Sequence, residues 1–172
     1  MAESEKGTTP LEQACRALFD FAVDRDDVKW LLQRLPRECP TPASKVEYEL
    51  QILKIIGVGW SISYHLEDRS WKQPLAEAYW QSVRAFSQEL SETTGLLIGQ
   101  DIDYFQTLKE RLDQYVRALQ KQPGAGEPAA VIGPEFARIC GHPEDLFVFM
   151  AGSKMFIHTV QRVGSYLQSF VS

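Results

Sequence analysis

The chain has 172 residues, of which 44% are hydrophobic and 24% charged, and its 18 basic and 23 acidic side chains give a net charge of −5. This composition excludes a wholly disordered chain and suits a single globular domain over residues 1–172. No basic block is present that could displace counterions from phosphates, so neither nucleic acid nor an anionic membrane surface is an expected partner.

The cysteines and the two ends of the chain favour a cytoplasmic protein. Cys15, Cys39 and Cys140 are far apart and odd in number, so they suggest neither a zinc site nor a redox motif. The chain starts with polar residues in place of the apolar stretch of a signal peptide, and residues 1–8 are expected to be disordered. Lys154 and Arg162 interrupt the most apolar segment, so no membrane span is predicted.

Helical signals begin close to the start of the chain. Thr9, Pro10 and Glu12 combine a capping hydroxyl, a proline at the first helical position and an acid three residues after the cap. The helix that they open has an apolar stripe formed by Leu11, Ala14, Leu18, Phe21 and Ala22. The acidic residues at positions 24, 26 and 27 are expected to break or re-cap this helix before a short apolar segment over 28–35.

A proline-rich stretch over 35–43 separates this region from the most apolar helix of the chain. Ser44 and Glu47 have the spacing of a second capping box, which predicts a helix that continues to about Leu66. Between Ile52 and Ile62 this helix is apolar on nearly every side, a pattern typical of a central helix surrounded by others.

The second half of the chain has the same helical periodicity. Apolar residues at steps of three and four predict helices over about 74–91 and about 98–119. The prolines and glycines of 122–134 indicate a mobile connection. A short helix over 134–140 and a last helix from about Glu144 complete the prediction. No convincing strand pattern is present, so the sequence predicts an all-α, single-domain bundle of about five to six helices, with the flexible loop 122–134 before the last two.

The segment from Gly57 to His65 contains small residues on a helix that is otherwise apolar. Gly57, Ser61 and His65 share one helix face, and such a row either admits a neighbouring helix or leaves room for a ligand. The helix contact is the favoured interpretation. In the alternative, His65 closes the polar end of a pocket and Asp68 orients its imidazole. The candidate ligand-binding residues are Gly57, Trp60, Ser61, Tyr64, His65 and Asp68.

A basic row lies on the last helix, where Lys154, His158 and Arg162 follow one another at four-residue steps. The simplest interpretation is a solvated face. The functional alternative is a weak docking strip for an acidic partner, in which each surface charge contributes little.

Catalytic signatures are absent from the sequence. It has no pair of Glu-x-x-His motifs for a di-metal site, no His-Glu-x-x-His, no Gly-x-Ser-x-Gly and no phosphate-binding Walker loop. Cys140 and His142 are close in sequence, but Gly141 and Pro143 favour a helix-end turn there. No metal or cofactor is expected, and the sequence leans away from an enzyme, although a site assembled from scattered residues remains an open alternative.

The abundant aromatic residues and the unusually apolar last helix favour a non-catalytic helical module that binds protein. Phe147, Val148 and Tyr166 are apolar residues beyond a single seam of that helix, so we expect the partner to be a second copy of the chain in a symmetric homodimer. The alternative function is a carrier of a small ligand or cofactor, with its pocket around Gly57, Ser61 and His65.

Overall fold

The computed structural model describes residues 7–67, 69–99 and 102–171, the side chain of residue 171 aside, and these residues form α-helices and no strand. The predicted all-α bundle is therefore confirmed over the described part of the chain. The helices are α1 (Pro10–Val23), α2 (Asp26–Leu32), α3 (Ala43–His65), α4 (Lys72–Ile98), α5 (Tyr104–Lys121), α6 (Ala129–Ile139) and α7 (Leu146–Val171).

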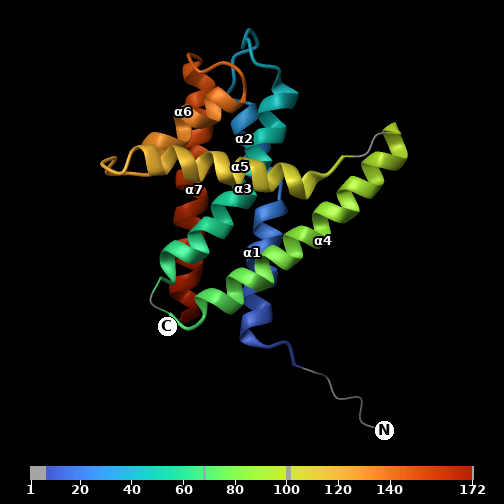
Figure 1. Ribbon diagram of the computed structural model, residues 1–172, viewed down its shortest axis with the longest axis vertical. Coiled ribbons are helices and arrows are strands. Elements are labelled where there is room, and N and C mark those ends of the chain that lie inside the picture. The colour runs from blue at the N-terminus through green and yellow to red at the C-terminus, as the bar shows by residue number, and fades with distance from the viewer. Residues whose placement is uncertain (1–6, 68, 100–101, 172) are drawn as a thin grey trace.

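Helix α3 is the centre of the bundle. It contacts α1, α2, α4, α5 and α7, and its residues are buried along most of its length. Helix α7 runs beside α3, and α5 crosses in front of both (Figure 1). Helix α4 rises diagonally across the molecule, and its C-terminal end projects away from the other helices (Figure 1). Every other helix can therefore bury an apolar side by packing against α3 or against a neighbour of α3.

The start signals at the first two long helices have different outcomes. At α1, Thr9 Oγ1 accepts from the Glu12 amide at 3.2 Å and Glu12 Oε2 accepts from the Thr9 amide at 3.1 Å, which confirms the first capping box. The second expected capping box, at Ser44 and Glu47, is wrong. Helix α3 begins at Ala43 without a side-chain cap, and Glu47 instead forms an ion pair with Arg25.

Two helix boundaries in the structure also differ from the predicted ones. Helix α4 continues to Ile98 and ends at Gly99, whose φ of 66° lies in the left-handed region that glycine tolerates. Ile98 therefore belongs to α4 and not to the following helix. The connection expected over 122–134 is shorter in the structure, because α6 begins at Ala129 and already buries Val131, Ile132 and Gly133. Residues 1–6, most of the segment expected to be disordered, lie outside the described residues.

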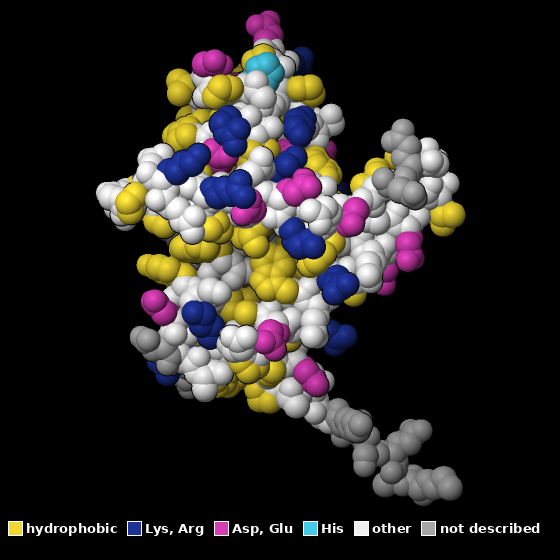
Figure 2. All heavy atoms as spheres, in the orientation of Figure 1, with side chains coloured by type: hydrophobic (Ala, Val, Ile, Leu, Met, Phe, Trp, Pro, Cys, Tyr) yellow, Lys and Arg dark blue, Asp and Glu magenta, His cyan; other side chains and the backbone are white. Residues whose placement is uncertain are grey.

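The surface in the view of Figure 2 divides by character. Charged side chains lie along α5, and hydrophobic side chains gather below it over α3 and α4 (Figure 2). Among the described residues, no helix combines the length and the apolar character that crossing a membrane would require.

Candidate functional site

The face of α3 that carries the small-residue row is covered by α7. A Cβ atom placed on Gly57 would lie 3.1 Å from Thr159 Cγ2, so the two helices are in close contact there. Ser61 is buried, and its hydroxyl donates to the Gly57 carbonyl of its own helix at 2.6 Å. Because α7 occupies this face, the arrangement is that of a tight helix crossing.

His65 lies at the end of the same contact. Its Nε2 is 3.2 Å from the Val160 carbonyl oxygen, and a Cβ atom on Gly164 would be 2.7 Å from the ring. The absence of a side chain at Gly164 therefore makes room for the imidazole. His65 joins α3 to α7, and its expected partner Asp68 lies outside the described residues.

The two aromatic residues of the candidate ligand site lie beside this contact. Trp60 and Tyr64 stack on each other with ring centroids 4.8 Å apart, and Tyr64 is exposed. Trp60 also contacts Phe156 of α7 at 5.3 Å. On the other side of α3, Gly59 faces the ring of Trp80 on α4. The small residues of α3 thus accommodate neighbours on two sides.

The structure separates the members of the basic row on α7. His158 Nε2 lies 3.3 Å from Asp27 Oδ1 on α2, so His158 belongs to a contact between two helices. Lys154 and Arg162 are exposed, and neither has an ion-pair partner among the described residues. Two positive charges therefore remain on this face of α7.

Asp27 also neutralises a buried lysine that the sequence analysis did not single out. The Lys54 ammonium on α3 is fully buried, 3.1 Å from Asp27 Oδ2, and donates to the Asp24 carbonyl at 2.9 Å. It also lies 4.3 Å from the centre of the Phe21 ring. A buried cation needs partners of this kind, because desolvation otherwise makes it costly. This network holds α2 against α3 and α7.

A groove of about 540 Å³ lies between α2 and α7, and Asp27 of this network is one of its lining residues. Its apolar lining comes from Leu31, Trp30, Met155 and Ile157, and its polar rim includes Asp26 and Lys154. The guanidinium of Arg34 lies 3.7 Å over the Trp30 ring and holds that side chain at the edge of the groove.

Exposed apolar side chains extend from the groove along α7. The exposed fractions are 50% for Trp30, 42% for Ile157, 46% for Met150, 54% for Phe147 and 71% for Leu146. Four of these residues lie on α7 between positions 146 and 157, and Trp30 on α2 lines the groove together with Ile157. We call this set the α2–α7 surface. Contiguous exposed apolar residues of this kind mark interaction surfaces on soluble proteins.

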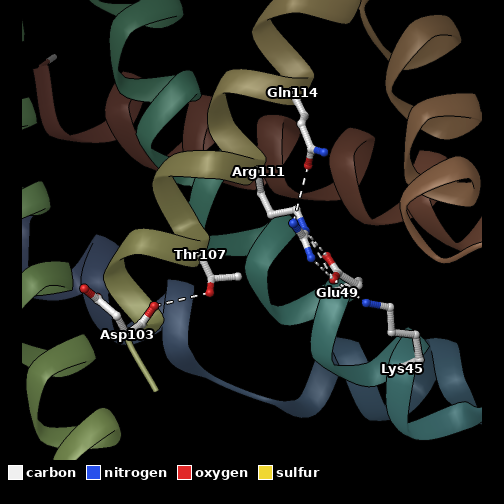
Figure 3. A network of polar contacts seen from close by, with 6 residues as sticks. All are labelled: Lys45, Glu49, Asp103, Thr107, Arg111 and Gln114. Atoms are coloured by element: carbon white, nitrogen blue, oxygen red, sulfur yellow. Dashed lines mark hydrogen bonds and ion pairs between the residues drawn. The ribbon is translucent and has the colours of Figure 1, made fainter. Parts of the chain in front are cut away.

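A second polar network stabilises the opposite side of α3. The buried Glu49 carboxylate accepts from Arg111 Nε at 3.0 Å and from Arg111 Nη2 at 2.9 Å, and Lys45 Nζ lies 3.1 Å away (Figure 3). The hydrogen bonds that Arg111 donates to Glu49 raise the pKa of Arg111. The buried carboxylate is compensated within the network, which is the arrangement of a structural ion pair joining α3 to α5.

Two thiols, those of Cys39 and Cys140, are not activated for nucleophilic chemistry. Burial raises the pKa of Cys140 from 9.0 to about 12. Burial and the neighbouring Asp145 carboxylate, which accepts from Cys39 Sγ at 3.2 Å, also raise the pKa of Cys39. Since the thiolate is the reactive form, neither side chain is poised as a nucleophile at neutral pH. Among the described residues, no cluster of three or more His, Cys, Asp or Glu side chains could hold a metal ion.

The site of greatest interest is therefore the α2–α7 surface, which the sequence analysis reached only through its α7 residues. Asp27, Trp30 and Lys54 were missed, because only the packing of α2 and α3 beside α7 brings them to this place. In comparisons with protein-family models, curated proteins and solved structures, nothing matches this chain.

Proposed function

We propose that the chain is a non-catalytic helical interaction module that self-associates through the α2–α7 surface. The observation that carries this proposal is the exposure of five large apolar side chains on α2 and α7, of which Trp30 and Ile157 line the groove. Burying them against a partner is favourable, because it removes apolar area from water. The alternative function is a ligand pocket at Gly57, Ser61 and His65. It is less favoured, because α7 packs against these residues and occupies the space that a ligand would need.

The distribution of these side chains suits an antiparallel pairing of α7 with its copy. The exposed apolar residues of α7 extend from Leu146 to Ile157. A two-fold axis near the middle of this stretch would place Leu146 and Phe147 of one chain opposite the groove beside Ile157 of the other chain. The exposed apolar end of each copy would then fill the exposed groove of its partner, which is the self-complementarity that a symmetric dimer requires.

The charges are consistent with the same pairing. At a rise of 1.5 Å per residue, Arg162 lies about 16 Å from the two-fold symmetry axis, measured along α7. Glu144 of the second chain lies about 11 Å from the symmetry axis, on the same side. The remaining offset of about 5 Å is within the reach of an arginine side chain. Arg162 and Glu144 are both exposed, so a salt bridge across the interface would complete the contact without burying a charge.

The size of the surface indicates a moderate affinity. The α7 face from Leu146 to Arg162 is about 24 Å long and about 10 Å wide, a projected area of about 240 Å². A standard interface covers about 800 Å² of each partner, so α2 and the groove must contribute as well. We therefore expect dimerisation in the micromolar range, with Trp30 and Phe147 as the main contributors.

A pair of aspartate substitutions tests the surface. Ile157→Asp should convert the dimer to a monomer, because it introduces a carboxylate at the centre of the apolar contact. Leu97→Asp is the matched control, since Leu97 is 80% exposed on α4 and lies outside the proposed interface. Size-exclusion chromatography with light scattering measures both variants. Equal masses for Ile157→Asp and Leu97→Asp would contradict the proposed surface.

Exchange of the two charges tests the orientation. Arg162→Glu should weaken the dimer, because it sets two acidic side chains against each other across the interface. Combining it with Glu144→Arg should restore the affinity of the unmodified protein. If the double variant loses as much dimerisation free energy as the two single variants lose together, the antiparallel arrangement is ruled out.

A further inference from the structure

Two methionines lie on α7 in opposite surroundings. Met150 is 46% exposed, whereas Met155 is completely buried and its Sδ lies 3.7 Å from Thr159 Oγ1. The third methionine of the chain, Met1, lies outside the described residues. A thioether is oxidised by a peroxide only where the peroxide reaches it. The two methionines of this helix should therefore differ strongly in reactivity.

The cysteines compete weakly for the same oxidant. The thiolate is the form of cysteine that reacts with peroxides. Burial raises the pKa of Cys140 from 9.0 to about 12, and burial together with the Asp145 carboxylate also raises the pKa of Cys39. Cys15 is only 9% exposed. At neutral pH, the exposed thioether of Met150 is therefore a more favourable target than these thiols.

Met150 lies in the middle of the apolar stretch of α7 that we assign to self-association. It is one helical turn from Leu146 and two turns from Ile157, so the three exposed side chains share one face. A two-fold axis near the middle of the 146–157 stretch passes within about 2 Å of Met150, measured along α7. The two copies of Met150 therefore come close to each other at the centre of the proposed interface.

Oxidation changes the character of this centre. A hydroperoxide transfers one oxygen atom to the thioether sulfur: an S–O bond forms and the O–O bond breaks. The sulfur is oxidised by two electrons, and the peroxide is reduced to water or an alcohol. The sulfoxide is polar, and its apolar neighbours Leu146, Phe147 and Ile157 donate no hydrogen bond to it. Dimerisation would then remove two polar groups from water next to the symmetry axis.

From these observations we propose that Met150 is an oxidation site that controls self-association, and that its conversion to the sulfoxide by a hydroperoxide dissociates the dimer. This inference rests on the proposed function, because Met150 has this role only if the α2–α7 surface is an interface. Self-association in turn protects Met150, since its thioether is covered in the dimer and exposed in the monomer.

Treatment of the full chain with hydrogen peroxide tests the proposal. Peptide mass spectrometry should show that Met150 gains one oxygen atom well before Met155. Size-exclusion chromatography with light scattering should show that the oxidised chain dimerises at least about tenfold more weakly, because two sulfoxides lose water in the contact. The oxidation of Met150 should also be slower above the dissociation constant of the dimer than below it.

Met150→Leu is the matched control. Leucine has nearly the same volume as methionine and no sulfur, so this variant should dimerise like the unmodified chain and remain dimeric in peroxide. Treating the oxidised unmodified chain with a methionine sulfoxide reductase should restore its affinity.

The untreated chain separates the two levels of the reasoning. If it is a monomer before treatment, the proposed function is contradicted, and this inference with it. If it is a dimer, any of three results overturns the oxidation site alone: equal oxidation of Met150 and Met155, an unchanged affinity once Met150 is oxidised, or dissociation of the Met150→Leu dimer in peroxide.

Discussion

Replacing Arg111 by methionine removes the main partner of a buried carboxylate. Glu49 is completely buried, whereas its second partner, Lys45, is partly exposed and makes a single contact at 3.1 Å. Breaking a buried ion pair from one side costs about 3–5 kcal/mol, because the remaining charge stays in a poorly solvated place. Since Lys45 still compensates part of the charge, we expect a value near the lower end, about 3 kcal/mol. For a chain of this size, that lowers the melting temperature by about 6–12 °C.

Thermal unfolding followed by circular dichroism measures this change against a control on the same helix. Arg117 pairs with Asp113 at 2.9 Å, but both side chains are exposed, so Arg117→Met should cost at most about 1 kcal/mol. Adding Glu49→Leu to Arg111→Met should recover part of the lost stability, because no buried charge then remains unpaired. If Arg111→Met and Arg117→Met unfold at the same temperature, the Glu49 network does not hold α3 to α5.

Three further predictions concern packing, backbone accessibility and titration. Gly57→Leu should lower the free energy of unfolding in urea by about 1–3 kcal/mol, because its side chain would overlap Thr159; an unchanged midpoint would mean that α7 does not press on this face. Limited proteolysis should cut first within 122–128, which forms no helix; first cleavage elsewhere would show that this stretch is held by packing. Stability should fall as pH rises above about 9, because burial raises the pKa of Cys140 from 9.0 to about 12 and that of Tyr79 and Tyr115 well above 10.0. The unfolded chain releases these protons first, so it is favoured at high pH, and a constant urea midpoint between pH 9 and 11 would contradict this reasoning.

Local signals in the sequence were sufficient for most of the fold. The Thr9–Glu12 box begins α1, and the predicted stripe of that helix supplies the buried Ala14, Leu18 and Ala22. The apolar character of the 52–62 segment on nearly every side identified the central helix. Both features depend on neighbouring residues alone, so the sequence contains all that is needed to find them.

The boundaries that were wrong depend on distant contacts. Ser44 and Glu47 have the spacing of a capping box, but Glu47 pairs with Arg25 from another segment. Pro134 suggested a helix start, whereas α6 begins at Ala129 and includes this proline. In each case the local pattern permits the prediction, and tertiary packing selects a different structure.

The candidate sites were even less accessible to sequence reasoning. Lys54 is the one lysine of the apolar 52–62 segment, and nothing in the sequence indicates that Asp27 is its partner. The α2–α7 surface joins Trp30 to residues more than a hundred positions further along the chain.

Sedimentation equilibrium of the unmodified chain tests the central claim, that the α2–α7 surface makes this protein a homodimer. At tens of micromolar, the apparent mass should approach twice the 19.6 kDa of one chain and decrease towards 19.6 kDa on dilution. A single species of 19.6 kDa across this concentration range would contradict the proposed self-association.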